Sequence, residues 1–374
     1  MTALEAEVGG PMWDFGETWY AFLGGGRIAL IYSSRGFDRL AVVEPSGELR
    51  TVETGLTAIS DVAASGEAAV CVAAPPHAPP AVVLVDLADG SYAPLSAAAE
   101  APIDPAYVSA PRPLDFETTD GEVAHALFYP PANPDFEGPP DERPPLLVHV
   151  HGGPTARVRP KLSLVFQYWT TRGFAVVDVN YGGSTGYGRA YRERLHGTWG
   201  VVDTDDAVNA ARALAAAGEV DGARMAITGG SAGGWTVLCA LAFHDAFAAG
   251  SDHYGVADLD GFASDTHKFE SRYLDWLVGP RTRSPADHAD DIRVPVIVLQ
   301  GEEDRVVPPS QSERIVAALA RNGIPHAYLT FPGEQHGFRR AETIQRVMEA
   351  ELSFYGQVLG FAPAGAIEPV ELRR

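Results

Sequence analysis

Residues 228–236 read TGGSAGGWT and set a single serine, Ser231, among four glycines. The segment follows the apolar run RMAIT and precedes WTVLCALAFHDAFA, a run with the length and apolar content of a helix. A sharp turn between a strand and a helix leaves no room for side chains beside its central residue, so glycines are needed there. The spacing Gly-x-Ser-x-Gly therefore predicts a strand–turn–helix that presents the serine hydroxyl at the carboxyl edge of a sheet. A tight turn or a phosphate-binding loop would carry similar glycines.

The second part of the chain alternates apolar strands with amphipathic helices. Helical patterns cover 203–217, 308–322 and 341–359, and a hairpin around Asp120-Gly121 comes first. This alternation predicts an α/β fold whose mostly parallel sheet is covered by helices on both faces. The expected buried strands are PLLVHVH, FAVVDVN, RMAITGG, VPVIVLQG and HAYLTF.

Residues 19–100 carry short β-type runs instead. RLAVVEPSGELRTVE and AVVLVDLADGSYAPL each read strand, acidic turn with glycine, strand, and they lie roughly 40 residues apart, a spacing typical of propeller blades. At about four strands per blade, this part has room for about two blades. We therefore expect an all-β partial propeller at 1–110, a Pro-containing linker at 101–113, an α/β domain at 111–362 and a tail at 363–374.

The composition excludes several classes of partner. The chain has 374 residues and a formal net charge of −21, and so acidic a surface repels nucleic-acid phosphates and anionic lipid headgroups. The N-terminus has no basic segment followed by an apolar run, and no window approaches the roughly 18 apolar residues of a membrane span. We expect a cytoplasmic protein with no nucleic-acid or membrane partner. Cys71 and Cys239 lie in apolar surroundings and predict buried free thiols.

A serine hydroxyl is a weak nucleophile until a base removes its proton, so an acid and a histidine are needed at the same edge of the sheet. VPVIVLQGEEDRVVP is a buried strand that ends in three acids, and AYLTFPGEQHGF is a strand followed by a loop that holds His336. Asp304 is preferred over Glu302 and Glu303 because a loop that opens a helix follows it. The order Ser231, Asp304, His336 is the chain order of α/β-hydrolases.

Backbone N–H groups would stabilise the oxyanion of the tetrahedral intermediate. Ala232 follows the serine, and HVHGGP at 149–154 ends a buried strand with two glycines, of which Gly153 is the expected second donor. His151 either holds this loop or contacts substrate. His149 and His151 share one face of a strand, an arrangement also found in metal sites, but no third ligand accompanies them. We expect no metal and no cofactor.

Four passages together resemble the prolyl oligopeptidase family of serine peptidases, in its acylaminoacyl-peptidase and dipeptidyl-aminopeptidase-like branch. They cover most of residues 112–360 and read HVHGGP, NYGGSTGYGRAYRERLHGTWGVVDTDDA, GGSAGGW, and GEEDRVVPPSQSE with FPGEQHGFRR. The resemblance implies a catalytic domain paired with a β-propeller and hydrolysis near the N-terminus of oligopeptides. It also implies that Ser231 is the nucleophile, His336 the base and Asp304 the acid that orients the base.

These observations predict a serine peptidase that acts on short peptides or aminoacyl compounds. An esterase or amidase would use the same groups, and a non-catalytic interaction module is a third alternative. His151, Tyr181 and Trp235 are candidate substrate contacts, together with the aromatic segment DTHKFESRYLDW at 265–276. A propeller of two blades leaves strand edges and an apolar face open, so we expect self-association or a separate chain that completes the ring, unless the chain is a fragment.

Overall fold

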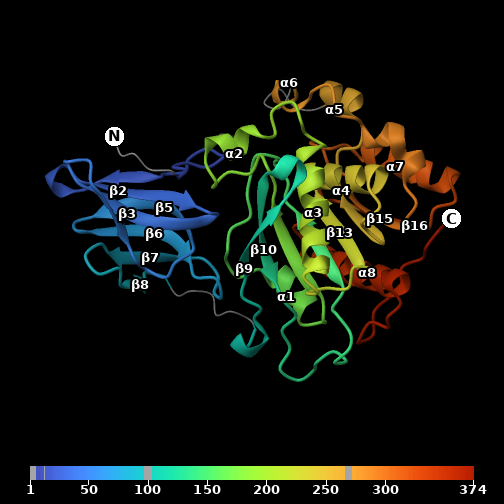
Figure 1. The fold of residues 1–374 in the computed structure, drawn as a ribbon, viewed down its shortest axis with the longest axis horizontal. Helices are drawn as coiled ribbons and strands as arrows, with labels where there is room; N and C mark the ends of the chain where they lie inside the picture. The colour runs from blue at the N-terminus through green and yellow to red at the C-terminus, as the bar shows by residue number, and fades with distance from the viewer. Residues whose placement is uncertain (1–5, 12, 97–102, 266–271) are drawn as a thin grey trace.

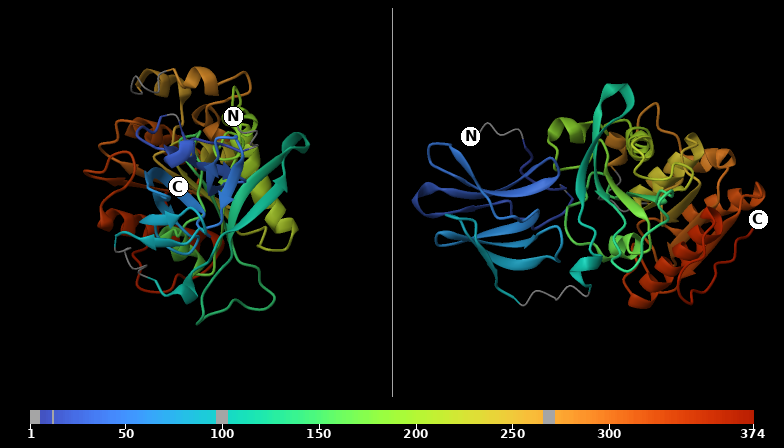
Figure 2. Two further views of the ribbon diagram at one scale, coloured as in Figure 1. Left: turned by 90° about the vertical axis from the view of Figure 1, so that its left-hand side faces the viewer. Right: turned by 60° about the horizontal axis from the view of Figure 1, so that its bottom comes forward.

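The computed structural model describes residues 6–11, 13–96, 103–265 and 272–374, and contains three sheets (Figure 1). Two small sheets occupy the N-terminal part, and one large sheet carries the rest of the chain. Figure 2 shows the small sheets beside the end of the large sheet that β9 and β10 form. An ion pair between Arg35 and Asp115 of β9 lies at this junction. The fold class expected from the sequence is confirmed.

The large sheet has eight strands in the order β16-β15-β14-β13-β11-β12-β10-β9. β9 and β10 form the expected hairpin, β10 is antiparallel to β12, and all other neighbours are parallel. The carboxyl ends of the parallel strands therefore meet at one edge, where ligands of α/β sheets bind. The strands are β9 (Arg112–Glu117), β10 (Val123–Tyr129), β11 (Leu146–Val150), β12 (Ala175–Asn180), β13 (Met225–Gly230), β14 (Ala249–His253), β15 (Val296–Gly301) and β16 (His326–Phe331).

Helices cover both faces of this sheet because successive side chains of a buried strand point to opposite sides. Val148 and Val150 of β11 belong to an apolar cluster with α3, α4 and α7, whereas Leu147 belongs to a second cluster with α1 and α8. The helices are α1 (Leu164–Thr170), α2 (Arg189–Glu193), α3 (Val202–Ala216), α4 (Ala232–Phe243), α5 (Leu259–Asp265), α6 (Leu274–Leu277), α7 (Pro309–Arg321) and α8 (Ala341–Leu359). Short 3-10 turns are η1 (Gly24–Gly26), η2 (Pro105–Tyr107), η3 (Thr119–Gly121) and η4 (Pro285–Asp291).

The N-terminal part consists of two antiparallel four-stranded sheets, as expected for about two blades. Their orders are β1-β2-β3-β4 and β5-β6-β7-β8, and Ile31, Leu40 and Ile59 form the centre of the apolar core of this part. The buried free thiols are confirmed, with Cys71 in this core and Cys239 in α4. The strands are β1 (Tyr20–Phe22), β2 (Ile28–Ser34), β3 (Phe37–Val43), β4 (Leu49–Val52), β5 (Ala58–Ser65), β6 (Ala68–Ala74), β7 (Ala81–Asp86) and β8 (Tyr92–Pro94).

The structure adds elements that the sequence patterns did not predict. β14 reads AGSDH and β5 reads AISDVAAS, and neither is an apolar run. α4 ends at Phe243, earlier than the apolar run suggested. Residues 101 and 102 of the expected linker lie outside the described residues.

The segment around Arg373 forms a short antiparallel bridge with the large sheet. The backbone of Arg373 pairs with His326 at the edge of β16, through N–O distances of 2.8 Å in both directions.

In the described ranges, none of the helices has the length and apolar content needed to cross a bilayer.

Candidate active site

Ser231 occupies a strained turn between β13 and α4. Its φ of 58° and ψ of −121° are unusual for a residue with a side chain. Its backbone N–H donates to the carbonyl of His253 at 3.0 Å, and its carbonyl accepts from the N–H of Trp235 at 3.1 Å. A Cβ at Gly233 would overlap the carbonyl oxygen of Val150, which explains the glycine at that position. The turn thus holds the serine side chain at the carboxyl edge of the sheet.

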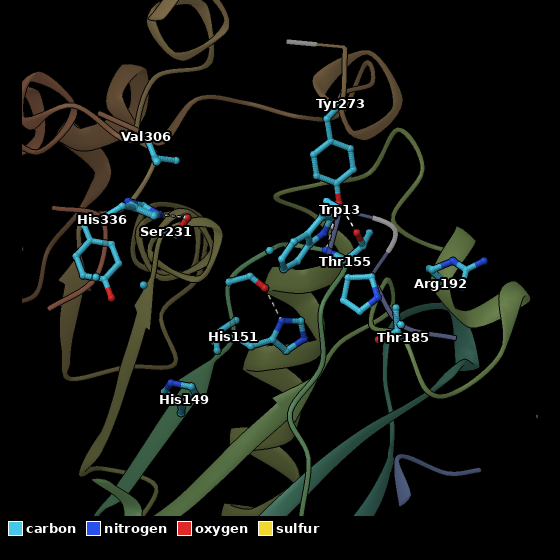
Figure 3. Close-up of a pocket in the computed structure, with 18 of the residues that line it drawn as sticks. Trp13, His149, His151, Thr155, Thr185, Arg192, Ser231, Tyr273, Val306 and His336 are labelled. Atoms are coloured by element: carbon cyan, nitrogen blue, oxygen red, sulfur yellow. Dashed lines mark hydrogen bonds between the residues drawn. The ribbon is translucent and has the colours of Figure 1, made fainter. Parts of the chain in front are cut away.

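Ser231, His336 and Asp304 form one hydrogen-bonded chain, and Figure 3 shows the part of it between Ser231 and His336. The Nε2 atom of His336 lies 2.9 Å from Oγ of Ser231, and its Nδ1 atom lies 2.7 Å from Oδ2 of Asp304. A carboxylate only accepts, so Nδ1 carries the proton and Nε2 is free to accept the proton of the serine hydroxyl. The structure therefore brings together three side chains that are 73 and 32 positions apart in the sequence.

Asp304 is fixed by the loop after β15. Its Oδ1 atom accepts the N–H groups of Val306 and Val307, each at 2.9 Å, and the side chain is buried. Glu302 instead accepts a hydrogen bond from the hydroxyl of Thr330, and Glu303 is exposed. Of the three acids that follow this strand, only Asp304 is hydrogen-bonded to His336 in the described part of the chain.

The loop of His336 is held by a second buried acid. Glu334 accepts the N–H groups of Arg339 and Arg340, each at 3.0 Å. The ring of Tyr254 meets the ring of His336 edge-on, with centroids 5.0 Å apart. Glu334 thus holds the backbone of this loop, and Tyr254 contacts the imidazole itself.

The loop at 151–156 passes beside the serine. A Cβ built on Gly152 would lie 3.0 Å from the carbonyl oxygen of Gly230 and 3.5 Å from Cβ of Ser231, so a side chain here would crowd the serine turn. Gly153 follows in a left-handed conformation, with φ of 124°, before a cis peptide bond to Pro154. Gly152 and Gly153 both line the cavity that contains Ser231 and His336.

His151 holds this loop and is uncharged. Its Nδ1–H donates to the carbonyl of Gly152 at 2.8 Å, so its Nε2 accepts the hydroxyl of Ser184, also at 2.8 Å. Burial lowers the pKa of His151 to about 4. Both ring nitrogens are thus engaged within the protein, although the side chain also lines the cavity.

Tyr181 and Trp235 lie in the core and do not line this cavity, contrary to the sequence-based expectation. The hydroxyl of Tyr181 donates to the carbonyl of Pro154 at 2.7 Å, and its ring stacks on His151. Trp235 is fully buried and stacks on Trp199 with ring centroids 4.7 Å apart. Their aromatic rings fill space behind the loop and the serine turn.

The cavity has a volume of about 1090 Å³ and a strongly aromatic lining. Tyr273 and Trp276 of the segment at 265–276 line it, whereas residues 266–271 lie outside the described residues. Tyr254 and Val306 complete the side near His336. Trp13 and Phe15 also line the cavity, and no sequence pattern had singled them out.

Two buried acids lie close to the site. Burial raises the pKa of Asp252, which precedes His253 on β14, to about 7. Burial opposes protonation of His253, but the carboxylate of Glu351 at 2.9 Å outweighs it and raises the pKa of His253. These groups therefore add buried titratable charge beneath the serine turn.

His149 does not form a metal site with His151. Its Nδ1 atom lies 2.6 Å from Oδ1 of the buried Asp178. Among the residues that the structure describes, no group of three or more metal-ligating side chains comes together.

The chain matches known serine peptidases. The model of the prolyl oligopeptidase family matches residues 160–362. Dipeptidyl aminopeptidase BIII of Pseudoxanthomonas mexicana is 32% identical over 274 residues, which cover 69% of this chain and 39% of that protein. This match agrees with the family resemblance drawn from the sequence motifs.

Solved structures agree with the fold. A puromycin hydrolase has a TM-score of 0.95 and 48% identity, over 100% of this chain and 58% of that chain. The acylaminoacyl peptidase of Pyrococcus horikoshii has a TM-score of 0.78 at 21% identity, over 91% of this chain and 56% of that chain. At this identity the similarity supports the fold only. The chain thus spans less than two thirds of the length of these proteins.

Proposed function

Because the chain belongs to the prolyl oligopeptidase family, we propose that it is a serine peptidase that hydrolyses peptide bonds near the N-terminus of short peptides. The observation that carries this proposal is the continuous hydrogen-bonded chain from Ser231 through His336 to Asp304, which opens into the aromatic cavity. The division into 1–110, 111–362 and 363–374 and the cytoplasmic location expected from the sequence stay predictions.

In the proposed reaction, Oγ of Ser231 attacks the carbonyl carbon of the scissile bond. Nε2 of His336 takes the hydroxyl proton, and Asp304 stabilises the imidazolium without accepting the proton itself. The backbone N–H groups of Gly153 and Ala232 would stabilise the oxyanion, and removal of one such donor in related chemistry costs about 3–4 kcal/mol. The position of Gly152 beside Ser231 and Ala232 supports an oxyanion site at this point.

The intermediate then collapses. His336 gives its proton to the nitrogen of the leaving group, the C–N bond breaks, and an acyl-enzyme on Ser231 remains. A water molecule, deprotonated by His336, attacks the ester and releases the acid. The products are the two halves of the cleaved amide.

The similarity to a puromycin hydrolase favours aminoacyl amides as substrates. Aromatic side chains dominate the cavity, and they suit an apolar or aromatic residue on the acyl side of the bond. We expect cleavage of aminoacyl arylamides and of puromycin, and the test is product identification by mass spectrometry. An enzyme that cleaves arylesters but leaves arylamides intact would instead be an esterase.

A non-catalytic module is the other alternative. A fluorophosphonate probe reacts with an activated serine, so the folded wild-type chain should be labelled at Ser231 and the Ser231→Ala variant should not. Absence of labelling in folded wild-type protein would favour the module.

The proposed partners are a short peptide or aminoacyl substrate and, for the small sheets, a second copy or a separate chain. Tyr20 and Phe22 of the outer strand β1 are 55% and 72% exposed. Exposed aromatic side chains on an outer strand favour association.

A further inference from the structure

The segment that leads into β1 is anchored to the α/β part through Glu7. The carboxylate of this buried glutamate accepts the N–H groups of Gly186 at 2.5 Å and Gly188 at 3.3 Å, and it pairs with Arg192. Its backbone pairs with Ser33 of β2, with N–O distances of 3.0 and 2.7 Å. Glu7 thus links the first small sheet to the loop that precedes α2.

A second acid holds the other end of this segment. Glu17 lies 3.6 Å from the guanidinium of Arg159, and the ring of Trp19 lies under the same guanidinium. Between the two anchors, Pro11, Trp13 and Phe15 line the cavity of Ser231. Anchors at both ends fix this stretch of chain against the cavity.

Trp13 and Phe15 are 50% and 83% exposed, unusually high values for two aromatic side chains held against a cavity. Figure 3 shows Trp13, Tyr273 and Thr155 on one side of the opening, and His336 and Val306 on the other. The hydroxyls of Tyr273 and Thr155 are hydrogen-bonded to each other, and Trp276 stacks on His196. Trp13, Thr155, Tyr273 and Trp276 thus form an ordered and mainly aromatic side of the cavity, away from His336, which we call the aromatic wall.

In the proposed reaction, the acyl half of the substrate lies against this aromatic wall. His336 must protonate the leaving nitrogen, so the leaving group lies beside His336 and the acyl group extends toward Trp13. In the described part of the chain, no aspartate or glutamate lines the cavity, and its arginine, Arg192, is already paired with Glu7. An uncharged, flat side chain matches such a surface best.

We propose that Trp13 and Phe15, held in place by Glu7, are specificity-determining residues that bind the aromatic side chain of the acyl residue. This inference rests on the proposed function in treating the Ser231 cavity as the substrate site and His336 as the group that protonates the leaving nitrogen. By this proposal, the segment before β1 that carries Trp13 and Phe15 forms part of the active site of the α/β domain.

The kinetic test compares phenylalanyl and alanyl 4-nitroanilides. Trp13→Ala and Phe15→Ala should lower kcat/KM for the phenylalanyl substrate by about tenfold or more, mainly through KM, and should change the alanyl substrate less than about threefold. Trp13→Phe keeps an aromatic ring and should stay near wild type. Phe136→Ala is the matched control, because Phe136 is 79% exposed and does not line the cavity.

The anchor is tested by Glu7→Gln, which removes the charge that Arg192 and the two N–H groups hold. It should weaken selectivity for the phenylalanyl substrate in the same direction as Trp13→Ala. Selectivity equal to wild type in Glu7→Gln would contradict the anchoring role.

A binding measurement separates this inference from the proposed reaction. In the 374-residue chain carrying Ser231→Ala, calorimetry should give tighter binding of phenylalaninamide than of alaninamide, and adding Trp13→Ala should remove most of that difference. Equal discrimination with and without Trp13 would overturn the inference. Failure of the wild-type chain to hydrolyse any arylamide, with this binding difference intact, would contradict the proposed reaction alone.

Discussion

At the scale of single residues, the backbone of Ser231 is shaped by its neighbours and not by its own side chain. Its strained φ and ψ are imposed by the packing of β13 against α4, and the glycines around it remove the colliding side chains. The geometry of the turn and the chemistry of the hydroxyl can therefore be separated by one substitution.

Ser231→Ala should abolish hydrolysis while the fold persists. Loss of the hydroxyl removes the nucleophile, so we expect kcat to fall by about 10⁴-fold or more. Thermal unfolding should change by no more than a few degrees, because no core contact is lost. Turnover near the wild-type rate would show that another group is the nucleophile.

The base role of His336 predicts a pH profile. A protonated imidazole can no longer accept the proton of Ser231, so kcat/KM should decrease as the pH is lowered. The measurement is kcat/KM on an arylamide from pH 5 to 8, with circular dichroism at each pH as the control for folding. A flat profile over this range would argue against His336.

Asp252 predicts how stability changes with pH. Burial raises its pKa from an ordinary 3.8 to about 7, so the folded chain retains a proton that the unfolded chain has lost. The contribution of Asp252 to the free energy of unfolding is fully present below about pH 4, and it is lost as the pH rises toward 7. Asp252→Asn should raise the melting temperature at pH 8 by a few degrees, and the gain should shrink near pH 4. A gain independent of pH would exclude this explanation.

Site residues could be predicted from the sequence where position in the chain carried the signal. Ser231, Asp304 and His336 each follow a buried strand, and parallel strands bring their carboxyl ends to one edge. Tyr181 and Trp235 were misplaced because an aromatic residue near a motif looks the same in sequence whether it faces a cavity or the core. Trp13 could not be found, because only the folded chain brings that segment to the serine.

At the scale of elements, the loop at 151–156 depends on side chains behind it. The hydroxyl of Tyr181 donates to the carbonyl of Pro154 at 2.7 Å and lies 3.2 Å from the carbonyl of His151. These bonds fix the backbone that carries Gly152 and Gly153. The hydroxyl of Tyr181 is therefore one of the groups that position this loop, together with His151.

Tyr181→Phe should lower kcat by about tenfold with little change in KM, because a displaced oxyanion donor affects the transition state more than the bound substrate. Kinetics on an arylamide and thermal unfolding are the measurements. Tyr129→Phe is the matched control, since Tyr129 is equally buried but packs on α1, away from this loop. Equal kinetic effects of both substitutions would mean that the loss reflects the core and not the loop.

Strands with strong apolar runs could be predicted from the sequence, and strands without such runs could not. β14 lies inside the large sheet, yet AGSDH has no apolar run, and a Cβ built on Gly250 would overlap Cδ1 of Leu241 in α4. β5 is interrupted by a register shift between Ser60 and Ala63, and Asp61 has a positive φ there. A bulge breaks the alternation from which a strand is predicted.

At the scale of the whole molecule, the small sheets present apolar side chains to solvent. Tyr92 of β8 is 41% exposed and Leu95 is 56% exposed, in addition to Tyr20 and Phe22 of β1. We expect the chain to self-associate with increasing concentration, as measured by light scattering. Tyr20→Ser with Phe22→Ser should weaken that association, and a monomer at every concentration would contradict it.

The anchor at Glu7 has a consequence for communication across the molecule. The same residue is hydrogen-bonded to a strand of the first small sheet and to the loop before α2, and the segment that follows it carries Trp13 and Phe15 of the cavity lining. Any binding event that shifts β2 would therefore alter substrate affinity at a distance. By thermodynamic reciprocity, substrate bound at the aromatic wall would change the affinity of the small sheets for any partner by the same factor.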